Sequence, residues 1–142
     1  MASDKQPAVV ELTIPCRPEF VSVARLAILG VASRMPLSYD EVEDVRLAVG
    51  EACTTAVERA VKVDKTDTKI TIRSEISDAK LTIDVIDQVG REPAPPAENT
   101  QSLEELDEQG LGALLMELLV DEIEVKPTPE GGTHVRMVKH VG

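Results

Sequence analysis

One carboxylate in this chain lies inside a run of small and apolar residues, where it could accept a proton. The run covers residues 47–56 and reads Leu-Ala-Val-Gly-Glu-Ala-Cys-Thr-Thr-Ala, with Glu51 in the middle. A helix that packs only for its core has no need of a carboxylate there, whereas a partly desolvated carboxylate beside a bound nucleotide is a usable general base. Glu51 is therefore a candidate catalytic residue. Its other interpretation is a solvated helix-face charge, or an ion pair with Arg59 or a lysine.

A second motif, Gly110-Leu111-Gly112, opens another apolar helix further along the chain. The first turn of a helix presents free backbone N–H groups and a partial positive charge, and phosphates bind there. Two glycines by themselves also fit a flexible hinge before a helix. Taken together with Glu51, they indicate an ATP site.

Composition restricts the class of protein. The chain has 142 residues, 42% of them apolar, and its aromatic residues are Phe20 and Tyr39, so a single domain with an aliphatic core is expected. A net charge of −11 argues against direct nucleic-acid binding, which needs a basic surface. No apolar run reaches membrane-spanning length and the N-terminus lacks a signal core, so a cytoplasmic protein is expected. Cys16 and Cys53 have no metal-ligand spacing and are expected to be free, buried thiols.

Two apolar periodicities alternate along the chain. Helical spacing from residue 18 to about 35 predicts one helix, and Ser38 with Glu41 is a capping-box signature that predicts the start of the next. On this second helix, Glu51, Thr55 and Glu58 are expected to share one face. Alternating β-branched residues predict strands at 9–14, 69–76, 81–85, 123–126 and 133–139, a loop at 88–109 and a helix at 110–120. This order predicts an α+β fold, a two-layer sandwich with a mixed, mostly antiparallel sheet and helices on one face.

Several ordered motifs resemble a known family nearly from end to end. They include Pro18-Glu19-Phe20-Val21, residues 30–35, residues 39–54, Gly110-Leu111-Gly112 with the following Leu114-Leu115-Met116-Glu117, and the closing Gly131-Gly132-Thr133. With these motifs the chain resembles the RsbW-type anti-sigma factors, which are serine protein kinases of the GHKL (HATPase) superfamily.

The resemblance implies a fold and a function. It implies one Bergerat-type ATPase/kinase domain over residues 1–142, with an ATP lid at about 88–109. It also implies an anti-sigma factor that inhibits an alternative sigma factor and uses MgATP to phosphorylate a serine of a STAS-type anti-anti-sigma protein. A homodimer is expected on the same ground.

The resemblance also implies roles for individual residues. Glu51 matches the catalytic carboxylate, and Asp87 matches the aspartate that binds the adenine amino group. The remaining matches are Gly110, Leu111 and Gly112 at the phosphates and Thr133 near the adenine.

Two positions depart from the family pattern. The family places a Mg²⁺-binding asparagine four residues after the catalytic glutamate, and this chain has Thr55 there. A threonine hydroxyl can also bind Mg²⁺, but it is shorter. The family also expects a glycine two residues after the adenine-binding aspartate, where this chain has Val89, followed by Gly90 that could replace it with a shift of one residue. The alternative function is therefore a sigma-binding module whose kinase activity is weakened or lost.

Overall fold

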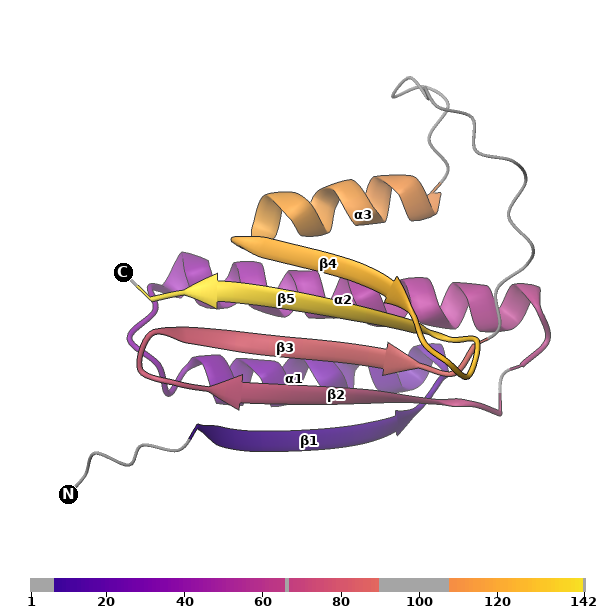
Figure 1. The fold of residues 1–142 in the computed structure, drawn as a ribbon, viewed down its shortest axis with the longest axis horizontal. Coiled ribbons are helices and arrows are strands. Elements are labelled where there is room, and N and C mark those ends of the chain that lie inside the picture. Colours follow the sequence, from indigo (N-terminus) through magenta and orange to yellow (C-terminus); the bar gives the residue numbers. More distant parts are fainter. Residues whose placement is uncertain (1–6, 66, 90–107, 142) are drawn as a thin grey trace.

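In the residues that it describes, the computed structural model has two layers, a five-stranded sheet and three α-helices, with the helices on one face of the sheet (Figure 1). The structure describes residues 7–65, 67–89 and 108–141. This architecture confirms the predicted α+β sandwich. Most of the predicted loop at 88–109, including Gly90, lies outside the described residues.

The helices and strands follow the predicted order, with small differences at their ends. Their bounds are β1 Ala8–Pro15, the 3-10 turn η1 Pro18–Phe20, α1 Val21–Ala32, α2 Tyr39–Lys62, β2 Lys69–Ile76, β3 Lys80–Asp87, α3 Glu108–Leu119, β4 Glu122–Pro127 and β5 Thr133–His140. Helix α3 begins two residues earlier than predicted, because the glycines at its start do not prevent helical geometry.

The strands lie in the order β1-β2-β3-β5-β4, and every pairing between them is antiparallel. Strand β5 enters between β3 and β4, so the end of β3 and the start of β5 meet. In this register Asp87 lies opposite Thr133. Two residues that the resemblance assigns to one nucleotide end are thereby brought together from distant parts of the sequence.

The capping box predicted for α2 is present. The Ser38 hydroxyl accepts from the Glu41 backbone N–H at 3.1 Å, and the Glu41 carboxylate accepts from the Ser38 N–H at 2.8 Å. This reciprocal cap satisfies two backbone donors that a helix start leaves unpaired. It sets the register of the long helix that carries Glu51, Thr55 and Arg59.

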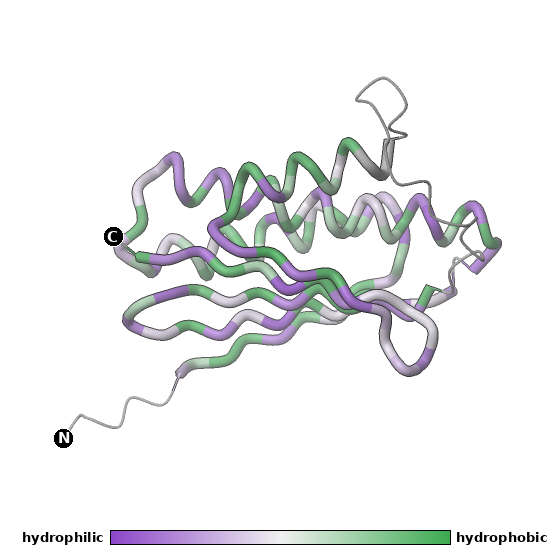
Figure 2. The backbone as a smooth tube through the Cα atoms, turned by 45° about the horizontal axis from the view of Figure 1, so that its top comes forward, coloured by the Kyte–Doolittle hydropathy of each residue, from purple (hydrophilic) through white to green (hydrophobic). Residues whose placement is uncertain are grey.

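The core lies between the sheet and the helices and is built almost entirely from aliphatic side chains. Alternate residues of the strands point into it, among them Ile70 and Ile72 of β2 and Ile83 and Val85 of β3. The tube coloured by hydropathy in Figure 2 shows this alternation along the strands. Burial also confirms the prediction for the cysteines, which are both free and buried, and burial raises the pKa of Cys53 to about 12.

The other face of the sheet carries a row of alternating charges, one from each strand. Cross-strand pairing places them in the order Glu11, Arg73, Asp84, Arg136 and Glu124. Asp84 is buried at the centre, where its Oδ1 lies 2.8 Å from Arg136 Nε and 2.7 Å from His134 Nε2. Burial alone would raise the pKa of Asp84, but the hydrogen bonds from Arg136 and His134 outweigh it and hold that pKa below its usual value.

None of the helices in the described part of the chain is both long and apolar enough to cross a membrane.

Candidate functional site

The candidate site is organised along one side of α2. Glu51, Thr55 and Arg59 follow one another at four-residue intervals, which places them on one gently turning stripe of the helix. Each of the three is partly buried. The stripe leads from α3 at Glu51 to the ends of β3 and β5 at Arg59, so one helix spans the whole site.

Glu51 lies against the start of α3. A Cβ built at Gly112 would overlap Glu51 Oε2 and would lie 3.1 Å from its Cδ. The two helices therefore approach so closely that only a glycine leaves space for the carboxylate. The structure thus brings together the predicted general base and the predicted phosphate-binding glycine.

Thr55 lies one turn further along α2. Buried hydroxyl groups normally form hydrogen bonds, and the hydroxyl of Thr55 does not follow this rule. Its Oγ1 is buried and has no hydrogen-bond partner within the described residues. Helical threonines often satisfy the hydroxyl by bonding to the carbonyl four residues earlier, and Thr55 does not do so. A buried hydroxyl without a protein partner is free to bind a ligand atom, so Thr55 fits the ligand role that the resemblance implies.

At the far end of the stripe, Arg59 pairs with Asp87, the residue that is predicted to bind the adenine amino group. Arg59 Nη1 and Nη2 donate to Asp87 Oδ1 and Oδ2 at 3.3 and 3.2 Å, and Nη1 also donates to Thr133 Oγ1 at 3.2 Å. The Asp87 side chain is only 3% exposed and that of Arg59 is 16% exposed. A buried carboxylate requires such a partner because its desolvation is otherwise uncompensated.

The backbone around Asp87 is as tightly arranged as its side chain. A Cβ at Gly132 would overlap the Asp87 carbonyl oxygen, so the start of β5 can pass the end of β3 only with glycine at this position. The Val89 N–H donates to Asp87 Oδ1 at 3.0 Å, while the Val89 side chain is fully buried in the hydrophobic core. Asp64 is the one non-glycine residue with positive φ among those described, so Val89 replaces the family glycine without entering the left-handed region.

The other predicted site residues are placed as follows. Gly110, Leu111 and Gly112 lie within the first two turns of α3, where Leu111 is 49% exposed. Glu58, one turn beyond Thr55 on α2, lines a hollow between α1 and α2 together with Arg25 and Thr54.

Arg59 is the site residue whose role the sequence interpretation missed. The sequence offers Arg59 as an ion-pair partner for Glu51, but in the structure Arg59 pairs with Asp87. The available signal was its spacing, four residues after Thr55 on the same helix stripe. What the spacing could not give was the strand end that meets this turn of α2.

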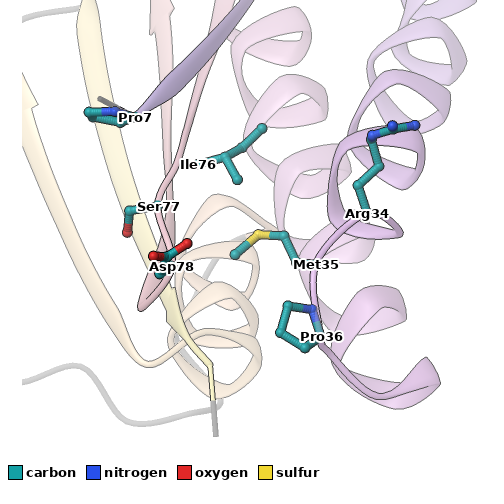
Figure 3. Close-up of a pocket in the computed structure, with 7 residues that line it drawn as sticks. All are labelled: Pro7, Arg34, Met35, Pro36, Ile76, Ser77 and Asp78. Carbon is teal, nitrogen blue, oxygen red and sulfur yellow. The ribbon is translucent and has the colours of Figure 1, made fainter. Parts of the chain in front are cut away.

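Another pocket lies at the opposite end of the sheet, beside the β2–β3 turn. It is lined by Pro7, Arg34, Met35, Pro36, Ile76, Ser77 and Asp78, and it holds about 240 Å³ (Figure 3). None of the predicted site residues lines it.

Within the described residues, no group of three or more His, Cys, Asp or Glu side chains could hold a metal ion.

The sandwich, with a carboxylate-bearing helix facing a glycine-containing helix start, is the arrangement of a histidine kinase-like ATPase domain. The model of the histidine kinase-like ATPase domain matches residues 14–139. Among curated proteins, the serine-protein kinase RsbW of Bacillus subtilis is 37% identical over 139 residues, covering 93% of this chain and 85% of its own length. The RsbW of Bacillus pumilus is 39% identical over 138 residues, with 92% and 84% coverage. The chain therefore belongs to the RsbW serine-protein kinases of the histidine kinase-like ATPase family.

A solved structure agrees on the fold. The RsbU and RsbW domains of a Mycobacterium tuberculosis protein match with a TM-score of 0.67 at 17% identity, covering 93% of this chain and 32% of that one. The agreement confirms the arrangement of layers on which the site depends.

Proposed function

We propose that this chain binds and inhibits an alternative sigma factor and uses MgATP to phosphorylate a serine of a STAS-type anti-anti-sigma protein. The observation that carries the catalytic half of this proposal is the stripe on α2, which places a carboxylate against Gly112 at one end and leads to a buried, paired aspartate at the other. The relatives' name, serine-protein kinase RsbW, supports the chemistry of the transfer.

In this proposal each residue along the stripe has one task. Glu51 accepts the proton from the attacking serine hydroxyl, and the start of α3, which contains Gly110 and Gly112, holds the phosphates. Asp87 and Thr133 hold the adenine. Because catalysis of phosphoryl transfer is almost entirely positioning and charge stabilisation, the close contact between α2 and α3 is central to the activity.

A Mg²⁺ ion would neutralise charge on the transferred phosphate when bound. Thr55 Oγ1 would hold it, since this hydroxyl is buried and without a partner in the described part of the chain. Mg²⁺ commonly keeps several waters and takes only one or two protein ligands besides phosphate oxygens, so a single hydroxyl is compatible with it.

The second candidate function is a sigma-binding module with weakened or lost kinase activity. It is favoured by Thr55 and Val89, which replace an asparagine and a glycine of the family pattern inside the nucleotide site. The two candidates differ in one measurable property, which is transfer of the γ-phosphate.

The deciding experiment is transfer of labelled phosphate from MgATP to the purified STAS-type partner. We expect transfer by the wild type and a loss of about 10²–10⁴-fold in Glu51→Gln, which keeps the shape of the side chain but cannot accept the proton. Glu58→Gln is the matched control on the same helix, since Glu58 faces the hollow beside α1, and it should retain transfer. A wild type that binds the sigma factor and transfers no phosphate would establish the module instead.

We also propose that the chain is a homodimer. Val9 and Val10 of β1 and Val23 and Leu26 of α1 are exposed apolar side chains in the N-terminal part of the chain. Sedimentation at micromolar concentration should show the dimer, and a monomer throughout that range would refute it.

A further inference from the structure

The ion pair between Arg59 and Asp87 determines which hydrogen bonds remain for a nucleobase. Arg59 forms a bidentate contact with Asp87, in which one guanidinium nitrogen donates to each carboxylate oxygen. In this bidentate fork, two parallel N–H···O bonds occupy the acceptor positions on the same side of the carboxylate, which is its strongest mode of hydrogen bonding. The contact is shielded from solvent, because the Asp87 side chain is only 3% exposed and that of Arg59 16% exposed.

The remaining acceptor capacity of Asp87 can be counted. An ionised carboxylate offers about four acceptor positions. Arg59 takes one on each oxygen, and the Val89 N–H takes a second one on Oδ1. Within the described residues, the carboxylate therefore keeps a single free acceptor position, on Oδ2.

A single acceptor distinguishes between purines. The 6-amino group of adenine is a hydrogen-bond donor and needs only one acceptor. Guanine has an acceptor, O6, at that position, and its N1–H and 2-amino groups bind a carboxylate best when both oxygens are open on the same side. Arg59 already covers that side of Asp87, so guanine finds one acceptor where it needs two.

We propose that Arg59 is a specificity-determining residue that acts through Asp87, and that its fork restricts the site to adenine nucleotides by excluding guanine. The proposal rests on the proposed function, in which Asp87 is at the base-binding end of the site. Arg59 is a positioning residue in this account. Arg59 also donates a hydrogen bond to Thr133 Oγ1, and so it positions the second residue that the proposed function assigns to the adenine.

The test compares the dissociation constants for MgATP and MgGTP, measured by calorimetry on the wild type and two variants of Arg59. The wild type should prefer ATP. In Arg59→Met the fork is gone, and the ATP preference should fall at least about tenfold, since GTP gains a hydrogen bond to a charged group. Arg59→Lys keeps the charge that a buried Asp87 needs but cannot form the fork, so it should also lose preference while remaining folded.

Arg46→Met is the matched control, because Arg46 lies on the same helix and pairs with Glu43 away from the site. It should leave the ratio of the two dissociation constants unchanged. If folded Arg59→Lys keeps the wild-type ratio, or binds neither nucleotide, the role of Arg59 in base selection is refuted while ATP binding by the wild type stands. If the wild type itself binds neither nucleotide, the proposed function fails and the inference fails with it.

Discussion

Replacing Gly112 by alanine should separate catalysis from stability. The new Cβ would overlap Glu51 Oε2 and would lie 3.1 Å from Cδ and 3.3 Å from Cγ. These atoms form the far end of a flexible side chain, so the carboxylate can swing aside without moving either backbone. The mutation therefore displaces the proposed base and leaves the helix packing in place.

The mutation should raise or preserve the free energy of unfolding and lower the rate of phosphate transfer. Alanine is favoured over glycine inside a helix by about 1 kcal/mol, so the free energy of unfolding should stay the same or rise by up to that amount. Moving a catalytic group by about 1 Å can reduce the rate by about 10²-fold. We therefore expect phosphate transfer to fall about 10²-fold in a protein that is at least as stable as the wild type.

The measurements are urea unfolding and single-turnover transfer to the STAS-type partner. Gly30→Ala on α1 is the control, because a Cβ there would meet nothing within 4 Å, so stability should rise and transfer should not change. Full transfer by Gly112→Ala would show that the carboxylate need not occupy its present position. A loss of stability in this variant alone would show that the overlap cannot be relieved by Glu51.

Three further outcomes are expected. Thr55→Asn should raise MgATP affinity about tenfold in calorimetry if an amide oxygen binds Mg²⁺ better than the hydroxyl, and a weaker affinity would show that Thr55 is an adapted ligand. Asp84→Asn should lower the free energy of unfolding by ~1–3 kcal/mol at neutral pH. Because the folded pKa of Asp84 lies below its unfolded value, this difference should persist above that unfolded value and disappear as pH falls through the folded pKa, and a difference independent of pH would refute it. Cys53 should resist alkylation at neutral pH until urea unfolds the protein, since burial raises its pKa to about 12, and rapid labelling of the native protein would contradict its burial.

Local signals in the sequence were sufficient to predict the helices and strands, and they also made Glu51 a candidate site residue. The Ser38–Glu41 capping box predicted the start of α2, and both of its hydrogen bonds are present. Period-two alternation predicted the β2–β3 hairpin, because a half-buried strand must alternate. Glu51 is predicted from a different local signal, a carboxylate among small and apolar residues, and its role stays a prediction.

The pairing of Arg59 with Asp87 could be decided only by the tertiary structure. The helical pattern in the sequence gives the face of α2 on which Arg59 lies, but it does not give the strand end that Arg59 meets. Which strand end lies there depends on the position of β5 between β3 and β4. The need for glycine at positions 112 and 132 has the same origin. Each lies where a second segment passes at van der Waals distance, Glu51 in one case and the Asp87 backbone in the other, and such close approach is a property of packing between segments far apart in the chain.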